Sequence, residues 1–250
     1  MSADNIFADF EVQRLSEPLF SLAGHDIAFT NTALFMFISV MMCTMLMTLA
    51  MRSKAVVPGR WQMVAEKIYN LVGDMLESNA GEKAKPFFPL IFTVFTFILF
   101  SNLSGLIPHS ASVTSHVIVN FAIAIMLFTV IITTGFARHG IGFLKLFLPK
   151  GIPVLIAPVM MFIELFSFLI RPFSLSIRLF GNMLAGHLLL HVFAGLTATL
   201  LGAGLLAGFS IFPFLLEIVL LAFEFFVAFL QAYIYAVLAS VYLHDAIEMH

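Results

Sequence analysis

Long apolar runs are the feature that most restricts how this chain can fold. The hydrocarbon core of a bilayer is about 30 Å thick, and about 20 helical residues span it. Three runs have that length, Phe29–Met51, Phe87–Leu106 and Val117–Ala137, and a fourth apolar stretch covers residues 152–243. Glycines and a proline interrupt the fourth stretch at 202–213, which divides it into two helices. The runs therefore predict about five membrane-crossing helices.

The composition agrees with this prediction. Hydrophobic residues make up 61% of the chain and charged residues 10%, with a mean hydropathy of +1.06. A soluble domain usually carries about 25% charged residues, enough to cover a surface in contact with water. We therefore expect an all-α integral membrane protein, with residues 1–250 forming a single membrane domain. The net charge of −2 gives no electrostatic reason to expect nucleic acid as a partner.

Neither the N-terminal segment nor the first apolar run carries a signal of processing or cross-linking. The only cysteine, Cys43, lies inside the run, so no disulfide within the chain is expected and its side chain is interpreted as an apolar one. Residues 1–28 contain five acidic side chains and only one basic side chain, Arg14. That charge is the wrong one for a cleavable signal peptide, so we expect an N-terminal segment outside the membrane.

The segment 52–85 has a different pattern from the apolar runs. It is rich in charged residues, and its apolar residues recur at helical spacing from Trp61 to Leu76. This pattern predicts an amphipathic helix lying on the membrane surface, with Trp61 at the interface. A helix packed on a soluble partner protein is the alternative.

Lysine and arginine in the short loops predict the orientation. Six of them lie in 52–86 and three in 138–150, whereas 1–28 has one and 107–116 has none. The two basic segments are therefore expected on the cytoplasmic side, or on the matrix side in a mitochondrion. Five crossings then place the N-terminus outside and the C-terminus inside.

The last two predicted helices are unusually long. Residues 153–201 would form a helix of about 73 Å and residues 211–244 one of about 51 Å, at 1.5 Å per residue. Neither fits upright in about 30 Å of hydrocarbon, and ordinary tilts average near 20°. We therefore predict that 153–250 forms a long, strongly tilted helical hairpin, with a bend near Pro172.

Each helix of the hairpin carries one polar stripe. Glu164, Arg171 and Arg178 are spaced seven residues apart, and so are Glu217, Glu224 and Gln231. Seven residues turn a helix through 700°, so the members of each trio share one face within about 20° per step. Ionisable residues inside lipid are costly and are functional candidates by default.

Folding the hairpin about its glycine-rich break predicts which residues lie opposite one another. With the centre near residue 205, Arg178 lies level with Gln231, and His187 lies level with Glu224. Arg178 is then surrounded by neutral side chains, including Ser174 on its own helix. A buried arginine normally has an acid beside it. Either Glu164 or Glu224 reaches Arg178 through water, or its counter-charge belongs to another subunit.

The remaining polar residues point to less specific roles. Arg171 lies near the basic side and precedes Pro172, so it is expected to extend toward the membrane interface. His187 and His191 have the spacing of a metal pair, but only leucines lie between them and the H-E-x-x-H pattern is absent, so neither a metal nor a cofactor is predicted. Asn102 and Asn120 either cap or bridge helices or line a water path.

Several motifs in sequence order resemble subunit a of rotary, F-type ATP synthases. They are FSNLSGLIPHS at 100–110, SIRLFGNMLAG at 176–186, AGHLLLH at 185–191, LQAY at 230–233 and YLHD at 242–245. The resemblance covers residues 86–250. The pairing of His187 with Glu224 is similar to that of alphaproteobacterial and mitochondrial members. Some bacterial members have an acid where this chain has Gly105, so no role is carried over to that position.

The resemblance implies a function in proton translocation without catalysis by this chain. It implies that Arg178 is the essential stator charge beside a rotating ring of c subunits, each with a carboxylic acid at mid-membrane. It further implies two offset proton half-channels, peripheral-stalk b-type subunits and a catalytic head that makes ATP. The expected location is the bacterial inner membrane, or alternatively the mitochondrial inner membrane.

Within that implied mechanism each polar residue has an expected role. Asn182 and Gln231 lie in motifs beside Arg178, His187 and Glu224 serve the outer path, Glu217 lies at its mouth, and Glu164 lines the inner path. Two other classes of protein were considered, a secondary transporter and a structural membrane scaffold. The absence of an internal repeat disfavours the transporter, and an uncompensated Arg178 disfavours the scaffold.

Overall fold

The structure is a computed structural model, which describes residues 14, 15, 17, 20–22, 25–52, 59–107, 112–147 and 156–248. Three predicted features lie wholly or partly outside the described residues. They are most of the N-terminal segment 1–28, the Pro108–Ser110 end of the first motif, and the first residues of the helix predicted from 153.

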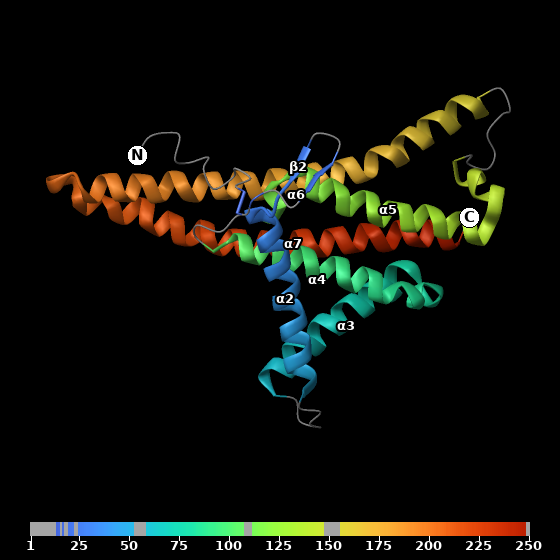
Figure 1. The fold of residues 1–250 in the computed structure, drawn as a ribbon, viewed down its shortest axis with the longest axis horizontal. Coiled ribbons are helices and arrows are strands. Elements are labelled where there is room, and N and C mark those ends of the chain that lie inside the picture. Colours follow the sequence, from blue (N-terminus) through green and yellow to red (C-terminus); the bar gives the residue numbers. More distant parts are fainter. Residues whose placement is uncertain are drawn as a thin grey trace. The chain divides into compact units, whose positions relative to one another are not determined.

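Within the described residues, five helices are long and apolar enough to cross a membrane, which confirms the predicted all-α membrane fold. They are α2 (Asn31–Arg52), α4 (Phe88–Gly105), α5 (Val117–His139), α6 (Ala157–Leu201) and α7 (Ile211–Ile247) (Figure 1). A small antiparallel hairpin of β1 (Phe20–Leu22) and β2 (His25–Ile27) precedes them and was not predicted.

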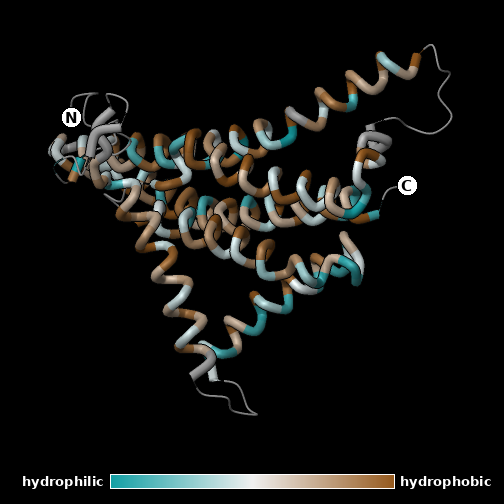
Figure 2. The backbone as a smooth tube through the Cα atoms, turned by 45° about the vertical axis from the view of Figure 1, so that its right-hand side comes forward, coloured by the Kyte–Doolittle hydropathy of each residue, from teal (hydrophilic) through white to brown (hydrophobic). Residues whose placement is uncertain are grey.

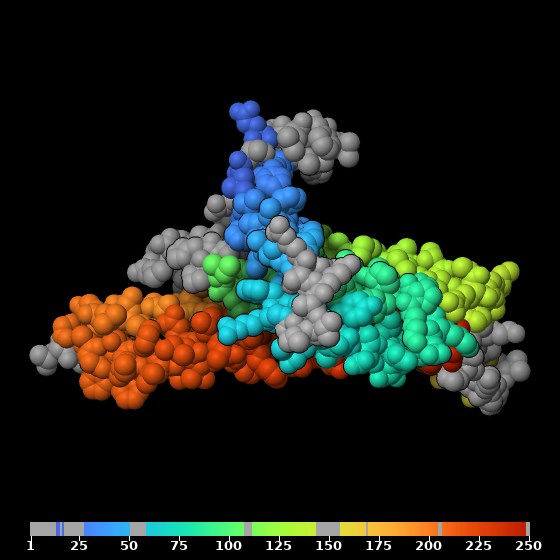
Figure 3. Space-filling view, turned by 90° about the horizontal axis from the view of Figure 1, so that it is seen from below, coloured from blue at the N-terminus to red at the C-terminus, as the bar shows by residue number. Residues whose placement is uncertain are grey.

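Of the charged segment between α2 and α4, the described residues 60–80 are helical as predicted and form no candidate span, whereas the span that contains α4 begins at Glu82. In α3 (Arg60–Ala80) the apolar stripe buries Ala65, Val72, Met75 and Leu76, while Trp61 stays exposed. A short 3-10 helix, η2 (Glu82–Phe87), joins α3 to α4, and the surfaces of these elements lie side by side (Figure 3). The membrane-surface position of α3 stays a prediction.

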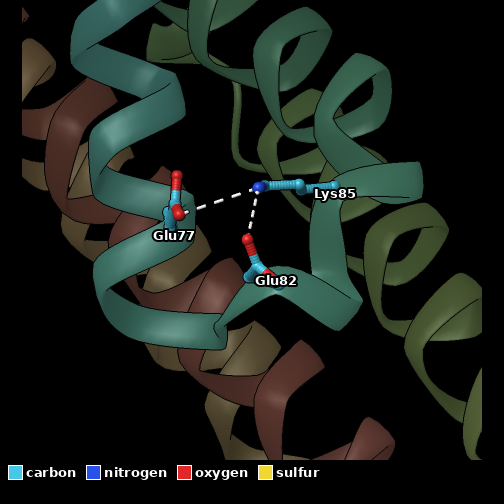
Figure 4. A network of polar contacts seen from close by, with 3 residues as sticks. All are labelled: Glu77, Glu82 and Lys85. Atoms are coloured by element: carbon cyan, nitrogen blue, oxygen red, sulfur yellow. Dashed lines mark hydrogen bonds and ion pairs between the residues drawn. The ribbon is translucent and has the colours of Figure 1, made fainter.

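Contacts at the turn between α3 and η2 explain why the charged segment folds back on α4. Lys85 Nζ lies 2.9 Å from Glu82 and 3.7 Å from Glu77 (Figure 4). The Tyr69 ring packs on Phe88, with ring centroids 4.7 Å apart. The lysine neutralises two carboxylates at the turn while the aromatic pair covers the apolar side.

The last two helices have the lengths that the sequence predicts. α6 has 45 residues and α7 has 37, which correspond to about 67 and 56 Å at the usual helical rise. Their break contains the 3-10 helix η5 (Gly204–Ser210), and Gly204 has a positive φ of 62°, a conformation that favours glycine. Their strong tilt in a membrane stays a prediction.

α6 continues through Pro172, which lies inside the helix and is buried. Proline has no backbone N–H, so one carbonyl in the preceding turn lacks its helical donor. The Ser176 hydroxyl donates to the Pro172 carbonyl at 2.8 Å, a bond to the backbone four residues earlier. Such bonds are typical of serines within helices, and they leave no hydroxyl proton for another partner.

The described residues group into two compact units. Unit 1 consists of the described parts of Met1–Leu46, Phe97–His116 and Leu179–Ala232. Unit 2 consists of the described parts of Met47–Thr96, Val117–Arg178 and Tyr233–His250. In unit 1 the second half of α6 and the first half of α7 run antiparallel and are joined by η5 (Figure 1). Both helices are largely apolar, with short hydrophilic interruptions (Figure 2).

In unit 2, the end of α7 is attached to two other elements. The His139 ring, at the end of α5, donates from Nε2 to the Ile247 carbonyl at 3.1 Å. Lys83 Nζ, in η2, lies 2.9 Å from the Glu248 carboxylate. The first contact gives a carbonyl in the last turn of α7 a donor, as a helix C-terminus favours, and the second joins the end of α7 to η2 through a pair of side chains.

Aromatic packing orders the rest of unit 2. The Phe128 and Phe168 rings join α5 to α6 with centroids 4.4 Å apart. The Phe143 ring, from the 3-10 helix η4 (Gly140–Phe147), lies directly on the backbone of Gly135 in α5. A Cβ at Gly135 would lie only 2.7 Å from Phe143 Cζ, so this contact depends on glycine.

We predict that Gly135→Ala lowers the free energy of unfolding of the detergent-solubilised chain by about 1–3 kcal/mol, the usual cost of overpacking. Thermal unfolding followed by circular dichroism measures the change. Gly142→Ala is the matched control, because no heavy atom lies within 4 Å of its Cβ position. Equal unfolding temperatures for the two variants would contradict the predicted clash.

Candidate functional site

In unit 1, the α6–α7 hairpin brings Glu224 onto the backbone of α6. Glu224 Oε1 occupies the space where a Cβ on Gly186 would lie, and Glu224 Cδ is 2.7 Å from that position. Gly186 precedes His187 directly, so the contact has the register predicted for the hairpin, with its centre at residue 205. His187 is 9% exposed and Glu224 is half-buried.

A second histidine also belongs to this group. His191 lies one helical turn beyond His187 on α6. His191 Nδ1 lies 2.8 Å from the His187 carbonyl, which can only accept, so Nδ1 carries the proton of that hydrogen bond. The sequence analysis paired Glu224 with His187 alone, although the spacing of His187 and His191 placed both on one face of α6.

Residues of α4 also contact this group. The Asn102 amide donates from Nδ2 to the Ala228 carbonyl at 3.1 Å, one helical turn beyond Glu224. Asn102 therefore bridges α4 and α7, one of the two roles considered for it. Gly105, one turn further along α4, faces both His187 Nε2 and Ser112 Oγ, at 3.5 and 2.9 Å from its Cβ position. The His187 ring is thus in contact with α4.

Other predicted residues of unit 1 lie at different depths. Gln231 is buried, Asn182 is exposed, and Glu217 is half-exposed near the η5 end of α7. Asn120, in unit 2, is fully buried. The predicted pairing of Arg178 with Gln231 stays a prediction, because Arg178 belongs to unit 2 and Gln231 to unit 1.

At the end of unit 1 next to η3 (Val113–Ser115) lies a third histidine, His116. Its Nε2 is 3.2 Å from the Thr32 hydroxyl. Partial burial lowers the pKa of the His116 imidazole, which favours the neutral ring near neutral pH. His116 therefore serves as a neutral hydrogen-bonding link between α2 and the segment before α5.

In unit 2, Arg171 is neutralised within the chain. Its guanidinium lies 3.7 Å from Glu164 and 4.0 Å from Asp245. Its Cζ also lies 4.8 Å from the centre of the Tyr242 ring and 5.4 Å from that of Phe168. Arg171 joins α6 to the end of α7, where two carboxylates and two rings satisfy it, and its extension toward the membrane interface stays a prediction.

Tyr242 and Asp245 were missed as partners of Arg171 in the sequence. Both belong to the YLHD motif, which contributed only to the resemblance. The signal available was the seven-residue spacing of Glu164 and Arg171, which puts an acid and a base on one helix face. That spacing predicts a pair, but it does not identify residues from a distant segment.

Arg178 differs from Arg171 in its surroundings. It is exposed on α6, and among the described residues of unit 2 no carboxylate forms an ion pair with it. Its charge acts on the Tyr242 hydroxyl, a neutral group. Glu164, which could have reached it, is engaged by Arg171 instead. Within its own unit Arg178 is therefore a cation without a counter-charge.

Comparisons with known proteins identify the family of this chain. The family model described as "ATP synthase A chain" matches residues 33–244. ATP synthase subunit a of Rhizobium rhizogenes is 47% identical over 228 residues, which is 91% of each chain. ATP synthase subunit a of Mesorhizobium japonicum is 45% identical over 250 residues, 99% of each chain. This chain belongs to the ATP synthase subunit a family.

Membership confirms the resemblance to alphaproteobacterial members. Subunit a is a membrane component of ATP synthase with a role in proton transport, and it acts in a complex with other ATP synthase subunits. The match covers α2 through α7, including both polar stripes and the Gly186 contact. The charges of the last two helices are therefore to be interpreted as parts of a proton-transporting subunit a.

We predict that Gly186→Ala disables proton pumping, because a methyl group at this position must displace the Glu224 carboxyl. A displacement of about 1 Å can lower the rate of a positioned step about 100-fold. ATP-driven acidification of membrane vesicles measures pumping. The matched control is Gly181→Ala on the same helix, where no heavy atom lies within 4 Å of the Cβ position. Normal pumping by the Gly186 variant would show that the contact between Gly186 and Glu224 is not needed for proton pumping.

Proposed function

We propose that this subunit a conducts protons through two offset half-channels that meet at Arg178, against a rotating ring of c subunits. The observation that carries the proposal is the contrast between the two arginines of α6. Arg171 has two carboxylates within 4.0 Å, whereas no described carboxylate of unit 2 pairs with Arg178. A cation held inside a membrane protein without its own acid is suited to an acid that arrives from another subunit.

The interaction of Arg178 with a passing acid has a useful size. Two unit charges about 4 Å apart attract by about 4 kcal/mol at an effective dielectric constant near 20. That attraction holds the ring carboxylate ionised while it passes Arg178, and the positive charge blocks direct proton flow between the two paths. Each proton that crosses 100 mV releases about 2.3 kcal/mol, which drives rotation.

The outer path contains the groups gathered in unit 1. His187 and Glu224 lie level on the hairpin, and both can gain and lose a proton near neutral pH when their surroundings favour it. Glu224 passes the proton to the ring acid, while Asn182 and Gln231 provide neutral hydrogen-bonding groups near Arg178. Glu217 lies one heptad nearer η5, where we place the outer mouth.

The inner path contains the acids of unit 2. Glu164 accepts the proton released by the ring acid, and Arg171 keeps Glu164 in position from a distance of 3.7 Å. Asp245 contributes a second carboxylate on the other side of the same guanidinium. Two acids around one base leave this region with a net negative charge, which attracts the proton released by the ring acid into the inner path.

The proposed setting follows the basic segments of the chain. The N-terminus lies outside and the C-terminus on the cytoplasmic side of a bacterial inner membrane, with b-type subunits of the peripheral stalk beside the chain. The subunit itself is not catalytic, since ATP is made in the soluble head of the complex. The proton path is therefore the whole contribution of this chain to energy conversion.

We predict that Arg178→Ala abolishes ATP synthesis driven by a proton gradient while the complex still assembles. The reason is that the ring acid then has no fixed positive charge to meet. Synthesis by inverted membrane vesicles, normalised to the amount of assembled complex, measures the effect. Arg138→Ala, at the exposed end of α5, is the control and should synthesise ATP normally. Sustained ATP synthesis by the Arg178 variant would show that Arg178 is not the essential stator charge.

We predict that His187 and Glu224 act as one pair. Either His187→Glu or Glu224→His alone should slow proton flux through membranes stripped of the catalytic head. The double exchange keeps one acid and one imidazole at the same level, so it should conduct better than at least one single variant. A double variant no better than the worse single variant would show that the two residues act separately.

A further inference from the structure

Gly105 of α4 marks a place where three segments distant in sequence meet inside unit 1. Ser112 Oγ lies 2.9 Å and His187 Nε2 lies 3.5 Å from its Cβ position. Both atoms therefore lie around one point, which any side chain at 105 would fill. Because residue 105 is glycine, the hydroxyl and the imidazole share this space.

The Ser112 hydroxyl is not used for local structure. Ser112 is the N-cap residue of η3, a position where serine usually bonds to the first N–H groups of the helix. Here the side chain makes no such bond, and Ser115 instead donates to the Ser112 carbonyl at 2.7 Å. The side chain is 3% exposed, and its Oγ has no hydrogen-bond partner among the described residues.

Two more buried oxygen atoms of unit 1 also lack a hydrogen-bond partner among the described residues. They are Asn102 Oδ1, one turn before Gly105, and Glu224 Oε2, beside Gly186. Buried polar atoms are normally satisfied, and a water molecule in a protein interior needs two to four such partners. Asn102 Oδ1 on α4, Ser112 Oγ before η3 and Glu224 Oε2 on α7 therefore suit a hydrated polar region in unit 1, and Ser112 Oγ shares the space at Gly105 with His187.

Ser39, another buried serine of unit 1, is arranged differently from Ser112, whereas the buried Ser101 Oγ also has no hydrogen-bond partner among the described residues. The Ser39 hydroxyl, fully buried in α2, donates to the Phe35 carbonyl at 2.8 Å and lies 3.2 Å from Ser104 Oγ. Such a hydroxyl is satisfied by its own helix and only joins α2 to α4. The Ser112 hydroxyl, in contrast, is turned toward an imidazole that exchanges protons in the proposed function.

We propose that Ser112 is a proton-relay residue on the outer side of His187. The Ser112 hydroxyl accepts a hydrogen bond from water on its outer side and donates one, through a bridging water, to His187 Nε2. A proton arriving at Oγ forms a new O–H bond while the original hydroxyl proton leaves to the bridging water, and that water gives one of its protons to Nε2. One proton enters and one leaves, and rotation of the hydroxyl restores the starting state.

This relay rests on the proposed function of His187 in the outer path. It adds a residue and a direction, since the proton reaches His187 from the side of η3 and Gly105. It also explains why a glycine is useful at 105 in this chain. A side chain at that position would fill the space that the hydroxyl, the water and the imidazole use.

Passive proton flux through membranes stripped of the catalytic head tests the relay. Ser112→Ala should lower the flux about tenfold, less than the 100-fold or more expected for loss of a proton-transfer group itself, because water partly replaces the hydroxyl. Ser112→Thr keeps the hydroxyl and should restore most of the flux. Ser39→Ala is the matched control, since it removes a buried hydroxyl that does not face His187.

The outcomes separate the relay from the proposed function. Flux of Ser112→Ala equal to that of Ser39→Ala, with Arg178→Ala and His187 variants still defective, overturns the relay alone. Equal loss in the alanine and threonine variants also overturns it, because the hydroxyl would then not matter. Normal function in the Arg178 and His187 variants as well would overturn the proposed function itself.

A second measurement does not depend on flux. In a chain with Cys43→Ser, Ser112→Cys should react with a small thiol reagent added from the outer side, because the relay requires water at this position. Reaction of this thiol with the reagent should stop proton flux. A protonophore added beforehand should not prevent that reaction. A thiol that stays unreactive in the assembled complex would show that position 112 is dry and would overturn the relay.

Discussion

Charge inside a membrane protein has to be compensated, and the two arginines of α6 meet this constraint in opposite ways. Arg171 is surrounded by Glu164, Asp245 and two aromatic rings, so its charge is balanced within unit 2. Arg178, seven residues later on the same helix, has no such acid among the described residues of that unit. One arginine is balanced within its unit, and in the proposed function the other remains available for the acid of a partner subunit.

Glycines determine how closely the polar groups can approach the helices. At Gly186 a carboxyl oxygen occupies the space of a Cβ, and at Gly105 a hydroxyl and an imidazole share it. At Gly135 the same absence of a side chain admits a phenylalanine ring instead. Helices in membranes associate closely where residues are small, and here that closeness admits polar groups in unit 1 and an aromatic ring in unit 2.

Much of the fold was predictable because membrane thickness restricts helix length. The apolar runs predicted five helices, and the glycines at 202–208 predicted the break between α6 and α7. The hairpin register followed from that break and agrees with the contact between Gly186 and Glu224. The helical spacing of 61–76 also predicted α3, and of its apolar stripe Val72, Met75 and Leu76 are buried whereas Trp61 and Val64 are exposed.

The contacts that depend on distant segments were not predictable. Asn102 bonds to a carbonyl 126 residues away, and nothing in the local pattern of α4 identifies that partner. The same holds for Asp245 beside Arg171, and for the small β1–β2 hairpin, whose strands are too short to produce a periodic pattern. Periodicity identifies the face of a helix, whereas the residue opposite that face depends on tertiary packing.

The hydrogen bond of His191 restricts what this imidazole can do. An imidazole passes a proton along a path by taking it at one ring nitrogen and releasing it at the other. Nδ1 of His191 donates to the His187 carbonyl, which has no proton to offer in return. Only Nε2 can then take up and release a proton, so His191 cannot pass a proton from one ring nitrogen to the other.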